Sequence, residues 1–328
     1  MDIFRTPVDA EVSKHQAGYH APLVFMGSCF SENIGNKLNE LRLPVCLNPF
    51  GILYNPVSIC QSLEYLLKGK VYKESDLGFH NGLWFSFDHH GRFSAIEQAD
   101  CLNRINESVE TGHQFLKKAS HLFITLGTAW VYQLRTSGKI VANCHKIPDS
   151  SFERRILQID EICRSFGTML KNLKKFNPDL QVVFSLSPVR HTRDGAIGNA
   201  HSKATLLVAI HRIIADNPGA AYFPAWEILM DDLRDYRFYE PDMLHPNSQA
   251  IEYIHDRFAH TWLTSETREI MKGMERIVLA RKHRPVNPDT EDFRRFILSA
   301  LAETHKMQEK YPKIDLSDDL NFFSRILE

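Results

Sequence analysis

The sequence lacks the features that mark several large classes of protein. Its 39 Lys and Arg balance 40 Asp and Glu, so it has no cationic excess for binding a nucleic acid. No apolar run approaches the roughly 18–20 residues that span a bilayer. Residues 1–7 do not show a basic segment followed by an apolar one, which is the pattern of a secretory signal. We therefore expect a cytoplasmic protein that binds neither nucleic acid nor membrane.

Motifs for disulfides, metals and nucleotides are also missing. None of the six cysteines forms a C-x-x-C pair, and the sequence H-E-x-x-H does not occur. Gly27 is the only glycine in the loop before the first helix, where a phosphate-binding loop would have several. We expect free thiols, no resident metal and no cofactor.

Short apolar runs alternate with segments of helical period, as in an α/β protein with a parallel sheet. Five runs are near-continuously apolar or end at Gly or Pro, as expected of strands covered on both faces. These predicted strands are 22–27, 45–50, 121–126, 181–186 and 221–224. Two β-hairpins are predicted between these units. One comprises 83–87 with a turn at 90–91, and the other comprises 131–134 and 140–141 with a turn at 137–138.

The composition changes near residue 264, where charge rises and strand patterns end. Helices are predicted at 267–281 and 289–306. We therefore divide the chain into an α/β domain, residues 1–263, and a helical extension, residues 264–328. The extension either packs back on the core, forms a lid, or makes a dimer contact that would give a homo-oligomer.

In an open parallel sheet, ligands bind outside the carboxyl ends of the strands. Asp242 and His245 lie in such a loop, three residues apart and just before a helix. This spacing lets the carboxylate orient one imidazole nitrogen while the other nitrogen faces a nucleophile.

Cys29 is a candidate for that nucleophile because it follows the first strand at the start of a helix. Free amides and the helix dipole favour an anion there, and a thiol pKa of about 8.5 can fall to roughly 3.5–7.5. Ser28 is the alternative nucleophile, although serine at this position also often caps a helix. Cys29 could equally be a small residue that packs the turn, so all three interpretations stay open.

The run Gly27-Ser28-Cys29-Phe30-Ser31 resembles the signature of the GSCFA family. The further blocks of that family are matched, in order, by residues 48–56, 125–132, 142–146, 187–191, 235–239 and 242–246. The resemblance covers residues 20 to 260. The family is itself similar to the SGNH (GDSL-type) hydrolases, which have a three-layer flavodoxin-like fold and mostly cleave esters. The resemblance thus implies this fold, with a five-stranded parallel sheet.

Carried over residue by residue, the G-D-S-L-[ST] block of the SGNH hydrolases puts Cys29 at the nucleophile position. The D-x-x-H block falls on Asp242 and His245, and the glycine that donates an amide to the oxyanion becomes Gly51. The G-x-N-D block puts Ala129 where those enzymes have an oxyanion-binding Asn, so this donor is absent.

Losing one oxyanion donor costs about 2.7–4 kcal/mol in transition-state stabilisation. The substitutes that we consider are the Thr128 hydroxyl, the Asn143 amide and the His145 ring, the last two if the hairpin folds over the site. Arg190 and His191 are expected to face the cleft. Arg190 suits a carboxylate or phosphate of the substrate, or it forms a salt bridge within its own loop.

The resulting hypothesis is an acyl-ester hydrolase or acyltransferase that uses Cys29, or Ser28, with His245 and Asp242. Its substrate would be a small acylated molecule that is anionic or a carbohydrate. The alternative is a non-catalytic module that binds a ligand in a degenerate site, and the alanine at position 129 favours it.

Overall fold

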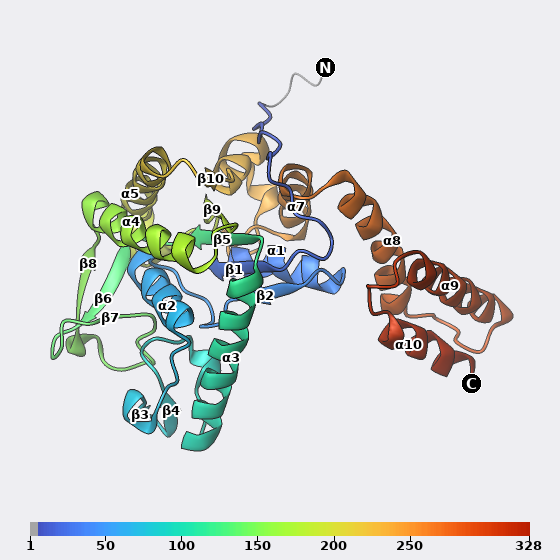
Figure 1. Cartoon of the computed structure of the whole chain (residues 1–328), viewed down its shortest axis with the longest axis horizontal. Coiled ribbons are helices and arrows are strands. Elements are labelled where there is room, and N and C mark those ends of the chain that lie inside the picture. Colours follow the sequence, from blue (N-terminus) through green and yellow to red (C-terminus); the bar gives the residue numbers. More distant parts are fainter. Residues whose placement is uncertain (1–5) are drawn as a thin grey trace.

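The computed structural model describes residues 6–328 and has a five-stranded parallel sheet between two helical layers (Figure 1). The strands are β1 (Leu23–Gly27), β2 (Val45–Leu47), β5 (His121–Leu126), β9 (Gln181–Leu186) and β10 (Ala220–Tyr222). Their order in the sheet is β10-β9-β5-β1-β2. Counted along the chain this is 5-4-3-1-2, the flavodoxin-like order, and the switch point lies between β1 and β5. The predicted three-layer flavodoxin-like fold is confirmed.

Alternate side chains of the strands enter two separate cores, because successive residues of a strand point to opposite faces. Val24 and Met26 pack toward one face, and Leu23 and Phe25 pack toward the other. The first face is covered by α2 (Pro56–Lys68), α3 (Gln98–Lys118), α4 (Ile159–Phe176) and α5 (Gly195–Asp216). The second is covered by α1 (Cys29–Glu40), the short α6 (Ala225–Glu227) and α7 (Ser248–Trp262).

β2 ends three residues earlier than the apolar pattern suggests. Asn48 adopts a left-handed backbone with φ of 45°, and the Gly51 N–H donates to the Asn48 carbonyl at 2.7 Å. Asn tolerates this conformation better than most residues. The segment 48–51 is therefore a tight turn that points the chain away from the sheet.

Two small antiparallel sheets flank the main one. β3 (Gly78–His80) pairs with β4 (Leu83–Phe85), and β6 (Trp130–Leu134) pairs with β7 (Ile140–Val141) and β8 (Phe152–Ile156). The second predicted hairpin is confirmed, and β8 joins it as an unpredicted third strand. The first prediction is wrong in its pairing, because the turn lies at residues 81–82, where both φ angles are positive, as two-residue hairpin turns require.

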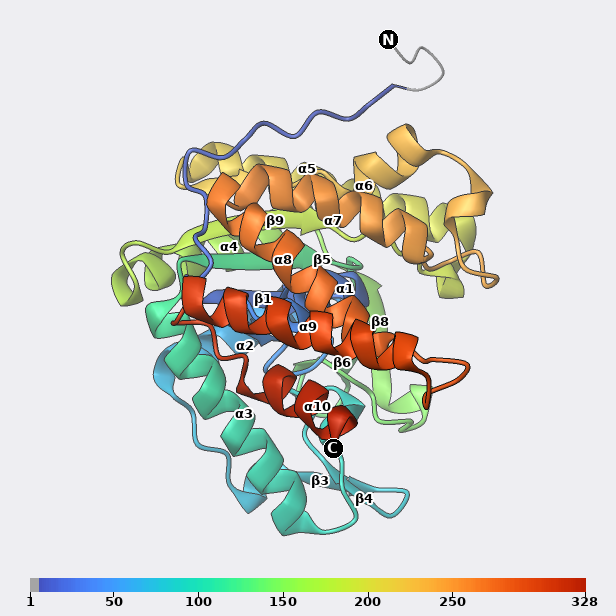
Figure 2. The same ribbon diagram turned by 90° about the vertical axis from the view of Figure 1, so that its right-hand side faces the viewer.

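The carboxyl-terminal segment forms three helices, α8 (Ser265–Lys282), α9 (Glu291–Lys310) and α10 (Ser317–Leu327), grouped beside the α/β body (Figures 1 and 2). The first two match the predicted helices, and α10 was not predicted. Buried Asp319 accepts hydrogen bonds from Arg42, just beyond α1, and from Arg281 of α8. The extension thus packs on the end of α1 remote from Cys29, about 18 Å along this 12-residue helix. The domain boundary near residue 264 stays a prediction.

No helix within residues 6–328 is long and apolar enough to cross a membrane.

Candidate active site

Cys29 begins α1 at the point where β1 ends. The turn depends on Gly27, whose φ is +133° and whose hypothetical Cβ would lie 2.1 Å from the Thr125 carbonyl oxygen. Only glycine fits there. Cys29 is partly exposed, and the amides of the first helical turn have no partner within the helix. The structure thus places the thiol at the switch point of the sheet.

Ser28 occupies the N-cap position of α1 but does not cap it with its side chain. Its hydroxyl donates to Oγ of Ser187 at 3.0 Å, and the residue is completely buried. Of the two nucleophile candidates, Cys29 is therefore the one that a substrate could reach in this structure.

The expectation of a lowered thiol pKa at Cys29 is wrong. Burial raises the pKa of Cys29 above its usual value, which outweighs the lowering by the amides of Phe30 and Cys29 and by the charge of Lys203. Glu32, in the first turn of α1, raises this pKa further. The thiol therefore needs a proton acceptor before it can attack a substrate.

Asp242 and His245 form the hydrogen bond that their spacing predicts, with 2.6 Å between Oδ2 and Nδ1. Asp242 also accepts from the backbone N–H groups of His245 and Leu244, and these bonds together with that from the ring lower the pKa of Asp242 to about 2. The ring of His245 is 47% exposed. The Arg190 N–H donates to the Leu244 carbonyl at 3.2 Å, which joins this loop to the exit of β9.

Within the described part of the chain, neither Ser28 nor Cys29 hydrogen-bonds to His245. His191 interacts electrostatically with His245, and its pKa is lowered to about 4 by burial and by the charges of Lys203 and His245. The Tyr54 ring packs edge-to-face on His191, with 5.2 Å between centroids. Burial, with the nearby Cys29, raises the pKa of Tyr54 to about 12. Cys29 and His245 thus lie at the same edge of the sheet and are linked through His191, which interacts with His245 and adjoins Tyr54.

Lys203 is a member of this site that the sequence analysis missed. It lies on α5, is only 3% exposed, and donates from Nζ to the carbonyls of Gly127 at 2.8 Å and Ser187 at 2.7 Å. Burial lowers the pKa of Lys203 to about 7, and Cys29 acts in the opposite direction.

A sequence signal for Lys203 does exist. It is in phase with buried Leu206, Ile210 and Ile213, three, seven and ten residues further along the helix. A lysine on the apolar stripe of a helix is unusual and indicates a buried charge with a specific partner.

Two of the predicted oxyanion donors are already paired. The amide of Gly51 donates to Asn48, as described above, so it is not free for a substrate. The Thr128 hydroxyl shares a hydrogen bond with Ser202 at 3.0 Å and accepts one from the Trp130 amide at 3.1 Å.

The other two substitutes also form hydrogen bonds within the protein. The Asn143 side chain accepts from the His145 N–H at 2.8 Å. The His145 ring bonds to the Ser86 carbonyl at 2.9 Å and stacks on Phe85, with 4.3 Å between centroids. Burial lowers the pKa of His145 to about 4. The His145 ring is therefore engaged elsewhere, whereas the side-chain N–H groups of Asn143 and the first-turn amides of α1 remain as candidate donors.

Arg190 stacks on two tyrosines, with its guanidinium 4.4 Å from the Tyr239 centroid and 5.4 Å from that of Tyr236. Among residues 6–328 no carboxylate forms an ion pair with it, so the salt-bridge alternative is wrong. With Arg234 it lines a small cavity of about 100 Å³.

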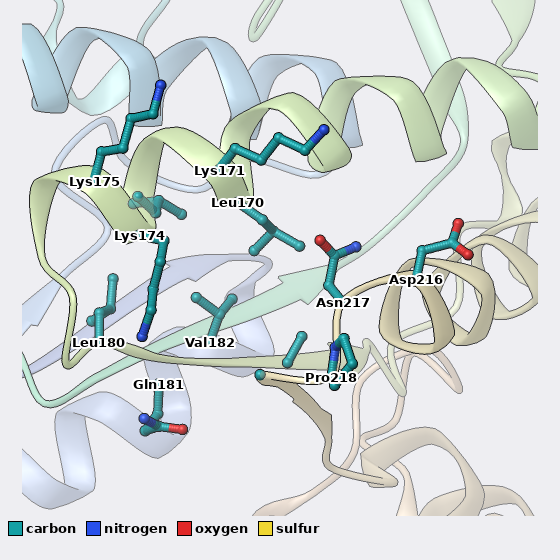
Figure 3. Close-up of a pocket in the computed structure, with 13 residues that line it drawn as sticks. Leu170, Lys171, Lys174, Lys175, Leu180, Gln181, Val182, Asp216, Asn217 and Pro218 are labelled. Carbon is teal, nitrogen blue, oxygen red and sulfur yellow. The ribbon is translucent and has the colours of Figure 1, made fainter.

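A cavity of about 540 Å³ lies at the opposite edge of the sheet, at the amino ends of β9 and β10. None of the site residues lines it. Leu170 and Val182 point toward the gap between helix and strand, whereas Lys171 and Lys175 extend away from it (Figure 3). The Lys174 amine donates to the Pro178 carbonyl. In the described residues no three His, Cys, Asp or Glu side chains are grouped to hold a metal.

Comparison with known proteins gives two family matches. The model described as the GSCFA family matches residues 22–258, and the model described as the GSCFA domain protein, C-terminal domain, matches residues 274–328. No curated protein matches the chain. Among solved structures, the chain is similar to an acetyl xylan esterase (Est2A) from the rumen bacterium Butyrivibrio proteoclasticus, with 11% identity and a TM-score of 0.38. The match covers 73% of this chain and 63% of the esterase, and it carries no inference about activity.

Proposed function

The chain belongs to the GSCFA family, and from that premise we propose that it is an acyl hydrolase or acyltransferase that acts on an ester or thioester through Cys29. The observation that carries the proposal is the 2.6 Å hydrogen bond between Asp242 and His245, at the same edge of the sheet as the partly exposed thiol. An imidazole oriented by a carboxylate and a thiol at a helix N-terminus are the groups that covalent acyl transfer needs.

In the proposed reaction, Sγ of Cys29 attacks the acyl carbon, and the proton of the thiol passes to Nε2 of His245. The amides of Cys29 and Phe30 stabilise the oxyanion. The leaving alcohol or thiol departs with the proton from His245, and a thioester remains on Cys29. His245 then removes a proton from water or from another acceptor, whose attack frees the thiol. Asp242 holds the imidazole in the tautomer that this requires.

The absence of a direct bond between Cys29 and His245 is consistent with this scheme, because catalytic hydrogen bonds often tighten only when substrate binds. Arg190 supports a substrate with a carboxylate or phosphate group, since its guanidinium is held over Tyr239 without a carboxylate partner in residues 6–328. A neutral carbohydrate ester is the other class of substrate to test.

The test is acylation of the protein by short esters and thioesters, followed by peptide mass spectrometry. We expect an acyl adduct on Cys29 in the wild type and none at that position in Cys29→Ala. If the wild type never forms an adduct, the covalent mechanism is wrong. Modification of Ser28 by an organophosphate, with indifference to thiol alkylation, would instead favour a serine esterase.

A second candidate function is a binding module without turnover. It is favoured by Ala129, which is buried where an SGNH hydrolase has Asn, and whose amide donates to Ser202 at 2.8 Å. A small anion or sugar that raises the melting temperature, together with no hydrolysis across the acyl panel, would support this alternative.

A further inference from the structure

Lys203 is a buried cation without an anionic side chain to balance it. In the described chain no carboxylate forms an ion pair with its amine, and its two hydrogen-bond partners are the neutral carbonyls of Gly127 and Ser187. The Trp226 ring, 5.3 Å from Nζ, is its cation–π neighbour. Burying an ammonium group without a counter-ion is costly. Placing this amine at the carboxyl edge of the sheet therefore costs desolvation free energy, which a leucine or methionine at the same position would not cost.

The surrounding hydrogen bonds satisfy the neutral amine completely and leave one N–H group of the protonated amine without an acceptor in the described residues. A neutral amine has two N–H groups, which the two carbonyls accept, and its lone pair is left over for a proton. A protonated amine has a third N–H group with no acceptor in the described residues. Burial lowers the pKa of Lys203 to about 7, so both states are accessible near neutral pH.

Cys29 is the one titratable group that favours the charged form of Lys203. In turn, the charge of Lys203 lowers the pKa of the Cys29 thiol, which burial has raised. Hydrogen bonds bring the two groups, from α1 and α5, to the same place. Lys203 donates from Nζ to the Ser187 carbonyl at 2.7 Å, and the Ser187 hydroxyl accepts from Ser28, the residue before Cys29, at 3.0 Å. The other titratable groups that act on one or both of them are Tyr54, Glu32 and His191, and His191 also interacts with His245.

We propose that Lys203 is the positioning residue that sets the protonation state of Cys29, taking up the proton that the thiol releases so that the reactive form is a thiolate–ammonium pair. The S–H bond breaks, an N–H bond forms on Nζ, and the net charge of the pair does not change. This inference rests on the proposed function, because it takes Cys29 as the nucleophile. It replaces His245 by Lys203 as the acceptor of the thiol proton. His245 then gives the leaving group a proton that it has taken from solvent, and it regains one from the acceptor that attacks the thioester.

The test is the pH dependence of Cys29 alkylation by iodoacetamide in the full-length protein. Peptide mass spectrometry reads residue 29 separately from the other cysteines, and no substrate is needed. In Lys203→Met we expect the midpoint of the rate profile to move upward by about one pH unit or more, so that alkylation near neutral pH slows about tenfold. The matched control is Lys171→Met, an exposed lysine at the opposite edge of the sheet, which should leave the profile unchanged.

An unchanged midpoint in Lys203→Met, or a larger shift in His245→Ala, would overturn the proposal. A reciprocal measurement covers the case in which Lys203→Met does not fold. NMR of the protein labelled with ¹³C,¹⁵N-lysine should show the pKa of Lys203 falling further in Cys29→Ala, because the thiolate that favours its charged form is gone. An identical lysine titration in wild type and Cys29→Ala contradicts the pairing.

These outcomes do not depend on turnover. The alkylation profile could support the pairing while acyl probes fail, which would leave the binding module as the function. Conversely, acyl adducts could form on Cys29 while Lys203→Met leaves the profile unchanged, and only the pairing would then be wrong.

Discussion

The two edges of the central sheet differ in what they hold. At the amino edge, β9 and β10 border a cavity of about 540 Å³ that is lined in part by Leu170 and Val182, while Lys171 and Lys175 extend away from it (Figure 3). At the carboxyl edge the cavity beside Arg190 has about 100 Å³, and Cys29, Lys203 and His191 lie around the turns that follow β1, β5 and β9. The amino edge therefore has a large cavity without polar side chains that converge on it. The carboxyl edge has polar groups that are close together around a smaller cavity.

The difference shows where this fold retains groups that weaken it. A buried lysine and a partly buried histidine whose Nε2 has no hydrogen-bond partner both lower stability, and such costs are typical of functional sites. Nothing comparable lies around the larger cavity. The carboxyl edge is therefore the better candidate for chemistry although it is the smaller space, and the following predictions test that conclusion.

The largest expected effect is that of Cys29→Ala. If the carboxyl edge is catalytic, the variant should lose acyl turnover to the uncatalysed background, because no other group can form the thioester. The measurement is hydrolysis of the best ester or thioester from the panel. Cys163→Ala, a partly exposed cysteine on α4, is the matched control and should keep wild-type turnover. Equal loss in both variants would indicate damage to the fold rather than to a nucleophile.

A somewhat smaller effect is expected for His245→Ala. General acid–base catalysis contributes about 10²- to 10⁴-fold, so kcat should fall within that range while the fold is unaffected. Asp242→Asn should lower kcat as well, because the amide cannot accept the bond from Nδ1 in the same way. The control is His283→Ala, an exposed histidine just beyond α8. Wild-type kcat in His245→Ala would remove the imidazole from the mechanism.

Lys203 should make stability depend on pH in a defined direction. Its pKa is about 7 in the folded chain, whereas an unfolded lysine has a pKa of about 10.4. Between these values the unfolded state binds more protons, so the wild type should gain stability relative to Lys203→Met as pH rises. The gain is at most about 1.4 kcal/mol per pH unit.

Urea unfolding of both proteins from about pH 7 to about pH 10 measures this difference. Lys171→Met serves again as the control, because Lys171 is exposed and lies at the opposite edge of the sheet. A constant difference between wild type and Lys203→Met would mean that Lys203 titrates normally.

The smallest effects come from adding one carbon at each edge. The Cβ of Gly127→Ala would lie 3.1 Å from Cδ1 of Tyr54 and 3.3 Å from Nε2 of His191, so both rings must shift by a few tenths of an ångström. We expect a loss of turnover of about tenfold, because small misplacements at reacting groups are costly. Gly219→Ala adds its methyl at the cavity edge, where nothing lies within 4 Å, and should change neither turnover nor melting temperature. The reverse result would move the site to the amino edge.

Much of the fold could be predicted because the strands are buried on both faces. A segment such as His121–Leu126, buried at every position, is visible as an apolar run. Short and half-exposed elements were less predictable. Three of the five residues of β8 are charged, so this strand has no apolar pattern that predicts it. The turn between β3 and β4 lies at Asn81-Gly82, a pair typical of two-residue hairpin turns, and not at the predicted position 90–91.

The candidate site divides in the same way. The Asp242–His245 bond could be predicted, since it depends on local spacing within one loop. The oxyanion donors could not be predicted from the sequence. Gly51 and Thr128 do follow the expected strands, but they form hydrogen bonds with Asn48 and Ser202. The sequence also does not show whether a substrate can reach Ser28 or Cys29. In the structure Ser28 is completely buried.

Periodicity and spacing within a few residues are sufficient to predict three features. These are the layered architecture, the helix that starts at Cys29, and the local pairing of Asp242 with His245. Only the tertiary structure decided the environment of the thiol: that burial raises its pKa, and that Lys203 reaches the same edge from a helix more than 170 positions away. The physical reason is that solvation and charge pairing depend on everything that surrounds a group, and those surroundings are assembled from segments that are far apart along the chain.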